Sequence, residues 1–120
     1  MSAVTKTIFT RIIERQLPAD FLFEDELCFV IKDIQPQAST HLLVIPRKPI
    51  PRLVDAGEED LNLLGHLMLV AVEIAKELGV GDAFRLVVNN GEDAGQTVPH
   101  LHLHILAEVS ESKKLVETNI

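Results

Sequence analysis

Apolar and polar residues follow helix and strand periods in turn along this chain, and the pattern predicts one helix, three strands, a second helix and two strands. The first helix is expected to start near Thr7, a candidate cap, and to end before Pro18. Because the strands are grouped instead of alternating with helices, the order predicts an α+β fold with an antiparallel five-stranded sheet, one short helix and one long helix. The strands are expected within residues 20–34 (two strands around a turn at Asp25-Glu26), 41–48, 84–90 and 100–108.

The long helix is the most apolar segment of the chain. Asp55 and Glu58 indicate a capping box at its start, and Gly79 marks its end. Its apolar residues form two stripes and leave only a narrow polar sector, so the helix should be buried over most of its girth. One sheet covers one side, and we expect a second copy of the chain on the other side unless the loops cover it. The stripes are Leu61, Leu64, Met68, Ala71, Ala75 and Leu78, and Leu63, Leu67, Val70 and Ile74.

Length, charge and cysteine content narrow the class of protein. The 120 residues are expected to form one domain, 1–120, with an aliphatic core because Trp and Tyr are absent. The net charge of −7 argues against non-specific binding to nucleic acid or to anionic membranes. The single cysteine, Cys28, excludes an intrachain disulfide and is expected to be buried. The sequence has no signal-peptide pattern and no apolar run long enough for a membrane span, so a cytoplasmic protein is expected.

Three of the five histidines alternate with apolar residues near the end of the chain, in the segment GQTVPHLHLHIL. On a strand, His100, His102 and His104 would share one face, while Leu101 and Leu103 would face the core. Three interpretations compete: a metal site, catalysis by imidazole, or a structural ladder of histidines. A purely structural role would be the best interpretation of one isolated histidine, but it is the weakest of the three for three histidines on one face.

The residues before the histidines favour chemistry on phosphate. Asn89, Gly95, Gln96 and Thr97 offer hydrogen-bond donors and close backbone approach, which suits phosphate oxygens. A zinc site would need carboxylate or thiolate ligands beside the histidines. The only cysteine, Cys28, lies far back in the chain, and the carboxylates Glu92 and Asp93 lie in the loop. The segment therefore indicates an anion cradle, and no metal is expected.

At these residues the sequence resembles the histidine triad (HIT) superfamily, whose signature is His-x-His-x-His-x-x with apolar x. Here the signature is HLHLHIL at residues 100–106, preceded by GQTV. The resemblance covers residues 7–107 and is strongest to the histidine triad nucleotide-binding (HINT) branch, through TIFTRII, FEDELCFVIKDIQPQASTHLLVIPRK, LLGHLM and RLVVNNGEDAGQTV. The tail, residues 108–120, differs from that branch throughout.

The resemblance implies a purine nucleoside phosphoramidase or nucleotidyl hydrolase. Such proteins are homodimers in which the sheets join across the interface and the long helices pack together. His102 would be the nucleophile, which forms a covalent nucleotidyl-imidazole that water then hydrolyses to a nucleoside monophosphate. A backbone carbonyl could hold its second ring nitrogen and fix its tautomer. His104 would contact the phosphate or leaving group, and His100 would support the nucleophile.

The resemblance also assigns binding residues and implies no cofactor. Asp33 would accept both ribose hydroxyls, and the alternative for this aspartate is a turn residue or helix cap. Thr97, Asn89 and Gln96 would contact phosphate or leaving-group atoms, with Gly95 and Val98 beside them. The apolar residues expected around the purine are Phe9, Ile12, Ile31 and Ile34. For Phe9 and Ile12, ordinary packing in the core is an equal alternative.

Several positions depart from the family pattern. Thr7 and Thr10 replace a Cys-x-x-Cys that holds zinc in some relatives, and Pro49 stands where many have a further histidine. Two alternatives to an active hydrolase stay open. One is a nucleotide-binding regulatory adaptor with weak catalysis, which the altered tail suggests, and the other is a metal-binding protein.

Overall fold

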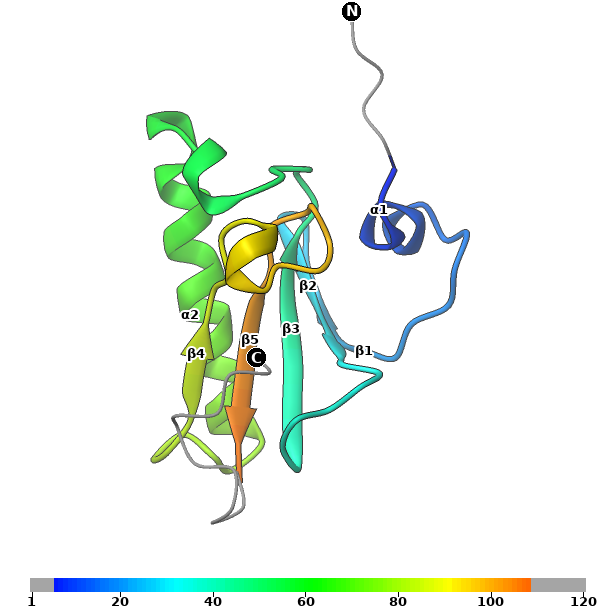
Figure 1. Ribbon diagram of the computed structural model, residues 1–120. Helices are drawn as coiled ribbons and strands as arrows, with labels where there is room; N and C mark the ends of the chain where they lie inside the picture. The colour runs from blue at the N-terminus through cyan, green and yellow to red at the C-terminus, as the bar shows by residue number, and fades with distance from the viewer. Residues whose placement is uncertain (1–5, 109–120) are drawn as a thin grey trace, which may run out of the picture.

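Five antiparallel strands form one sheet in the order β1-β2-β3-β5-β4 in the computed structural model, which describes residues 6–108. The sheet lies between two helices, α2 on one face and α1 on the other (Figure 1). This arrangement confirms the predicted antiparallel α+β fold with one short and one long helix. The elements are α1 (Ile8–Ile13), β1 (Phe21–Glu24), β2 (Cys28–Lys32), β3 (Thr40–Pro46), α2 (Leu61–Glu77), β4 (Arg85–Val87), β5 (Leu103–Ala107) and the short 3-10 helices η1 (Leu53–Asp55), η2 (Glu58–Asp60) and η3 (Glu92–Ala94).

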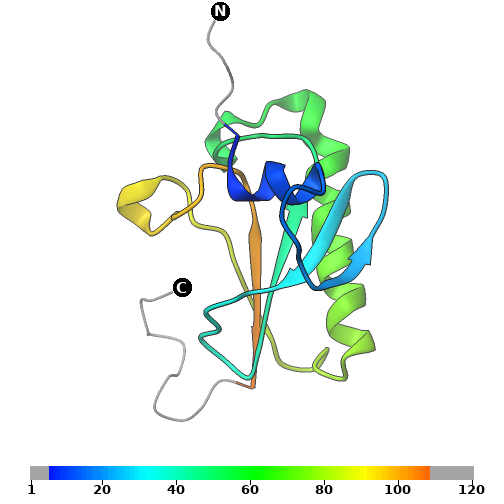
Figure 2. The same ribbon diagram turned by 90° about the vertical axis from the view of Figure 1, so that its right-hand side faces the viewer.

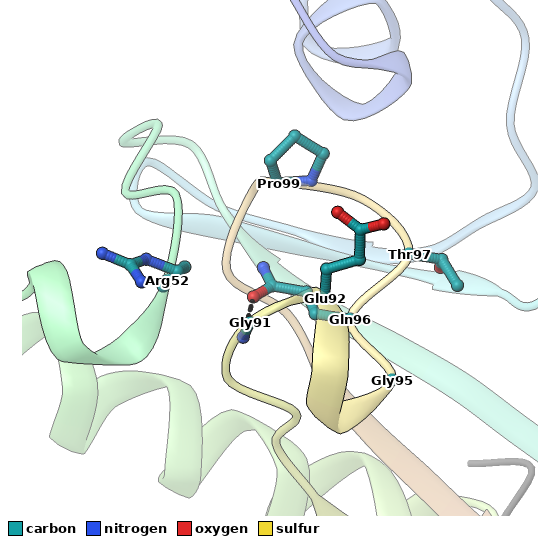
Figure 3. Close-up of a pocket in the computed structure, with 7 residues that line it drawn as sticks. All are labelled: Arg52, Gly91, Glu92, Gly95, Gln96, Thr97 and Pro99. Atoms are coloured by element: carbon teal, nitrogen blue, oxygen red, sulfur yellow. Dashed lines mark hydrogen bonds between the residues drawn. The ribbon is translucent and has the colours of Figure 1, made fainter.

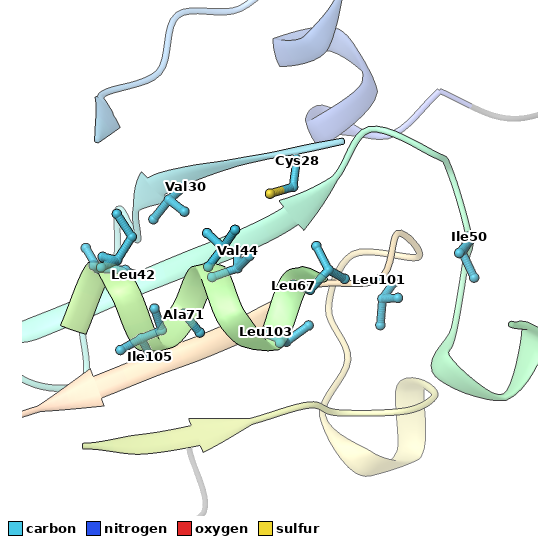
Figure 4. Close-up of a cluster of buried hydrophobic side chains, with 12 residues drawn as sticks. Cys28, Val30, Leu42, Val44, Ile50, Leu67, Ala71, Leu101, Leu103 and Ile105 are labelled. Atoms are coloured by element: carbon cyan, nitrogen blue, oxygen red, sulfur yellow. The ribbon is translucent and has the colours of Figure 1, made fainter. Parts of the chain in front are cut away.

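The alternation of side chains along the central strands divides the core between the two faces of the sheet. On β3, Leu42 and Val44 pack toward α2, whereas Leu43 and Ile45 pack toward α1. The α2 side holds the larger apolar cluster, which includes Cys28 as a fully buried side chain (Figure 4). Both faces of the central strands are therefore buried, which explains why these strands are almost continuously apolar.

The first helix begins where the sequence indicates. The Thr7 hydroxyl accepts a hydrogen bond from Thr10 N at 3.2 Å and caps α1. Phe9 and Ile12 are buried, and this face of the helix lies over the sheet near the ends of β3 and β5 (Figure 2). The two threonines that replace the Cys-x-x-Cys of some relatives thus meet in a helix cap.

The long helix starts later than predicted. The expected capping box at Asp55 and Glu58 is wrong, because α2 begins at Leu61. Asp55 instead accepts from Arg52 N at 3.1 Å and closes η1, and Asp60 accepts from Gly57 N at 3.0 Å and closes η2. The two acidic residues cap their own short turns. The predicted end is confirmed, since Gly79 follows the helix with a φ of +77°.

The fifth strand is shorter than predicted and starts at Leu103 instead of residue 100. Leu101 N donates to Ile50 O at 2.7 Å, and His100 N donates to Val98 O at 2.8 Å. These loop contacts take the backbone groups that a sheet ladder would need. The alternation persists nevertheless, since Leu101 and Leu103 both belong to the core on the α2 side.

One side of α2 stays exposed in the single chain. The first predicted stripe is buried only in part: Ala71 and Ala75 lie in the core, whereas Leu61 is 73% exposed and Met68 51% exposed. Leu69, beside them, is 66% exposed. The second stripe, centred on Leu67 and Val70, faces the sheet. No helix among residues 6–108 is long and apolar enough to cross a membrane.

Candidate active site

His102 is held in one orientation by the backbone that precedes it. Its Nδ1 donates to the carbonyl oxygen of His100 at 2.7 Å, and the side chain is only 5% exposed. This bond fixes the proton of the neutral ring on Nδ1 and leaves a lone pair on Nε2. Nε2 has no hydrogen bond from any described residue, and His102 lines a cavity of about 460 Å³. The backbone acceptor anticipated from the sequence is thus present.

His100 is the residue that holds the backbone acceptor of His102 in place. Its Nε2 donates to Pro46 O at 2.8 Å, which ties the histidine segment to the end of β3. The Phe9 ring packs edge-on against both His100 and His102, with ring centroids 5.7 and 5.1 Å apart. His100 is fully buried, so its side chain belongs to the support of the site and not to its open surface.

His104 carries the opposite tautomer, because a chain of hydrogen bonds starts at a backbone amide. Gln37 N donates to His41 Nδ1 at 2.9 Å, so the proton of neutral His41 lies on Nε2. His41 Nε2 lies 2.9 Å from His104 Nδ1 and donates to it. The proton of neutral His104 is therefore on Nε2, and His104 lines the same cavity as His102. Neighbouring rings, 5.0 Å apart, thus present a lone pair and a donor.

The environment keeps these rings neutral. Burial lowers the pKa of His102, of His100 and of His41 below their usual values. Burial, and then the neighbouring His102 and His41, lower the pKa of His104 to about 4. At neutral pH, His104 is therefore a hydrogen-bond donor without a positive charge, and His102 keeps its lone pair.

The cavity that contains His102 and His104 is lined mainly by apolar side chains and by one carboxylate, that of Asp33. Phe9, Ile12, Ile31, Ile34 and Val98 line it, as the sequence leads us to expect. Ile34 is 91% exposed, which leaves an apolar surface open at the mouth of the cavity. Asp33 lies in the same cavity; one carboxylate oxygen accepts from Gln35 N at 2.8 Å, and the other lies 3.3 Å from His41 Nε2. Asp33 is therefore both a turn residue and part of the site.

A second cavity, of about 640 Å³, lies beside the glycine-rich loop (Figure 3). Gly95 and Gln96 line it, and Gly95 has a φ of +100°, which favours glycine at this turn. Thr97 lines both cavities, and its exposed hydroxyl has no hydrogen bond from the described residues. Thr97 is therefore the one residue that lines both cavities, and it supplies a hydroxyl donor there.

Gln96 behaves differently from the sequence-based expectation. Its Nε2 donates to Pro51 O at 2.7 Å and to Val98 O at 2.9 Å, and its Oε1 accepts from Gly91 N at 2.8 Å. The amide braces the loop and has no N–H left for a phosphate oxygen. Asn89 lines neither cavity, but it follows β4 by two residues, and the β4–β5 register, which pairs Val87 with His104, continues toward His102 at this position. Its contact with phosphate stays a prediction.

His41 is the site residue that the sequence interpretation missed. It lies 63 positions before His104, in a strand whose next four residues are apolar, and nothing nearby in the sequence marks it. The strand register supplies the signal: Leu43 pairs with His104 and His41 with Leu106, so His41 and His104 are diagonal neighbours on one face. A polar residue on a buried strand, read together with the pairing, would have identified it.

Two groups of side chains bring possible metal-ligand atoms within 4.8 Å of one another in the described part of the chain. The first is Asp33, His41 and His104, which the hydrogen-bond chain already joins. The second is Asp25, Cys28 and His66, in which His66 Nε2 lies 2.7 Å from Asp25. Burial raises the pKa of the Cys28 thiol to about 12, so this sulfur is held as a thiol. The expectation of a metal-free site stays a prediction.

Comparisons with known proteins agree with the motif. A family model described as the HIT domain matches residues 14–111. An uncharacterized HIT-like protein from Synechocystis sp. is 59% identical over 100 residues, which cover 83% of this chain and 88% of the relative. A HIT family hydrolase from Clostridium thermocellum superposes with a TM-score of 0.86 at 36% identity, over 95% of this chain and 100% of that one. A histidine triad nucleotide-binding protein from Candida albicans gives a TM-score of 0.83 at 27% identity, over 93% of this chain and 81% of that one.

Proposed function

The chain belongs to the HIT domain family, and from this premise we propose that it is a purine nucleotide-binding hydrolase of the HINT type. Its substrates are nucleoside 5′-phosphoramidates or related nucleotidyl donors, which it cleaves at the α-phosphorus. The observation that carries the proposal is the fixed tautomer of His102, whose Nδ1 donates to His100 O at 2.7 Å and whose Nε2 lone pair is free in a cavity.

The reaction proceeds in two displacements at phosphorus. First, the Nε2 lone pair of His102 forms a bond to the α-phosphorus, the bond from phosphorus to the leaving nitrogen breaks, and that nitrogen takes a proton from solvent. Attack places a positive charge on the imidazole, and the His100 carbonyl stabilises it through Nδ1–H. Then water adds to phosphorus, the bond to Nε2 breaks, and a proton returns to solvent with release of the nucleoside monophosphate.

His104 and Thr97 stabilise the negative charge on the phosphoryl oxygens. Because the pKa of His104 is lowered to about 4, His104 acts as a neutral donor from Nε2 and not as the source of the proton. The chain from Gln37 N through His41 holds that donor in place. The Thr97 hydroxyl supplies a second donor at the edge of the cavity.

The nucleoside occupies the apolar end of the cavity. Ile34, which is 91% exposed in the free protein, closes over the purine together with Ile12 and Phe9. Asp33 accepts the ribose hydroxyls with the carboxylate oxygen that does not accept from Gln35 N and that also faces His41 Nε2. A purine nucleotide would therefore bury apolar surface that the free chain leaves in water.

We further propose a homodimer built on α2. The exposed apolar strip of this helix consists of Leu61, Met68 and Leu69, with the open Gly65 between them and the half-buried Val72 one turn further on. A second copy would cover the strip by an isologous contact. The edge strand β4 lies on the same side of the molecule as α2 (Figure 1), so pairing of β4 with its copy would extend the sheet. A cytoplasmic location stays a prediction from the sequence.

Hydrolysis of adenosine 5′-phosphoramidate, followed by release of AMP in the presence of a chelator, tests the proposal. His102→Ala should abolish turnover and the added adenylyl mass on the quenched protein, whereas His66→Ala, which alters a histidine outside both cavities, should keep both. An unchanged rate in His102→Ala would overturn the proposal. AMP binding without turnover in the native chain would favour the regulatory adaptor instead.

A further inference from the structure

We infer that Glu92 makes this protein select substrates whose leaving group carries a positive charge. The inference rests on the proposed hydrolysis at His102 and concerns the group that departs from phosphorus. It assigns a role to the cavity beside the glycine-rich loop, which lies outside the cavity proposed for the nucleotide.

The position of this cavity fits a leaving-group site. In a displacement at phosphorus, the attacking and leaving atoms lie roughly in line, so the leaving group departs on the side opposite His102. The nucleotide cavity contains His102, His104 and Thr97, whereas the second cavity contains Thr97 but no histidine. A phosphate held at Thr97 would therefore direct its leaving group into the second cavity.

The free charge of this cavity is negative. Two charged residues line it, Arg52 and Glu92. Arg52 donates from Nε and from a terminal nitrogen to both carboxylate oxygens of Asp55, each at 3.0 Å, and its charge is matched there. Figure 3 shows the Arg52 guanidinium directed away from the loop, whereas the Glu92 carboxylate extends toward the segment between Thr97 and Pro99. Glu92 has no ion pair within residues 6–108.

The other polar groups of the cavity do not offset this charge. The Gln96 amide is occupied by backbone groups of Gly91, Val98 and Pro51, and the Thr97 hydroxyl can serve the phosphate. An amine or ammonium group a few bonds from the scissile nitrogen would meet the Glu92 carboxylate, while a carboxylate there would be repelled. The substrate class is therefore a nucleotidyl donor with a cationic amine in its leaving group.

Three adenosine 5′-phosphoramidates test the inference: those of ethylenediamine, propylamine and β-alanine, with cationic, neutral and anionic ends on matched chains. Because Glu92 is exposed, we expect kcat/KM for the cationic amidate to exceed that for the neutral one by about fivefold at low salt and less at high salt. Glu92→Gln should remove the difference and Glu92→Lys should reverse it. Asp93→Asn, next to Glu92 but outside the cavity, should keep the native order.

The outcomes separate the two proposals. Equal kcat/KM for all three amidates, or a charge preference that Glu92→Gln keeps, would overturn the inference while the hydrolase stands. If no amidate is hydrolysed, the hydrolase fails, and the charge preference is read from dissociation constants of the three amidates. Those constants, measured on His102→Ala by calorimetry with and without Glu92→Gln, would support the inference if the cation binds more tightly only when Glu92 is present.

Discussion

His41 Nε2 lies 2.9 Å from His104 Nδ1, and through this contact a backbone amide determines the tautomer of a histidine in the triad. His102 and His104 therefore differ in tautomer although they line the same cavity. His102 offers a lone pair on Nε2, and His104 offers an N–H donor on Nε2. The motif alone does not distinguish them. The distinction comes from His100 O on one side and from Gln37 N on the other.

Replacing His41 by alanine should lower the rate without abolishing it. The variant leaves His104 free to place its proton on either nitrogen, so the donor is lost part of the time, and we expect kcat to fall by about tenfold. Nitrogen NMR of labelled histidines should show His104 with its proton on Nε2 in the native chain and a mixture of tautomers in His41→Ala. A native kcat, or an unchanged His104 tautomer, would contradict the role given to His41.

The buried histidines should make the protein acid-sensitive above the range in which carboxylates titrate. A histidine whose pKa is lowered by folding binds fewer protons in the folded chain, so its contribution to stability is complete above pH 6.5 and is lost as pH falls toward the folded pKa. For His104, with a folded pKa of about 4, the free energy of unfolding should fall by about 3 kcal/mol between pH 6.5 and 4.

Urea unfolding at several pH values measures this loss. His41, His100 and His102 should steepen it, since burial lowers the pKa of each. The pKa values of Asp25, Asp55 and Asp60 are lowered below 3.8, so protonation of these carboxylates reduces the free energy of unfolding only under more acidic conditions. His104→Asn should flatten the curve between pH 6.5 and 4, and a slope unchanged in this variant would refute the assignment.

Much of this fold was accessible from patterns that are local in the sequence. Periods of two or 3.6 residues predict the order of elements and the start of α1 at the Thr7 cap. The period of two also predicts that Leu101 and Leu103 face the core while the histidines face the other side of the strand. The start of α2 was not accessible in this way, because Asp55 and Asp60 each close a short turn that resembles a helix cap in sequence. His41 was missed because its partner is brought to it only by the pairing of β3 with β5.

The role of Gln96 shows the same limit and leads to a further prediction. Its side chain joins three backbone groups, of Gly91, Val98 and Pro51, the last of which lies 45 positions away in the sequence. Gln96→Ala leaves these groups without their partner in a buried position, and we expect a loss of about 2 kcal/mol in the free energy of unfolding together with slower turnover. Gln16→Ala, at an exposed amide outside both cavities, should change neither, and equal stability of the two variants would show that the brace is dispensable.

The last prediction concerns the exposed side of α2. Leu61, Met68 and Leu69 would leave a sizeable apolar strip in water if the chain were monomeric, and monomers rarely expose such strips. Met68→Glu would place a charge at the centre of the contact, opposite its own copy, and should convert a dimer into a monomer. Glu77→Lys, on the polar side of the same helix, is the matched control. Light scattering after gel filtration gives the mass of each variant, and a native chain that elutes as a monomer would contradict the dimer. If Met68→Glu is monomeric and still binds AMP, the nucleotide site is complete within one chain, as the single cavity formed by Asp33, Ile34 and His102 leads us to expect.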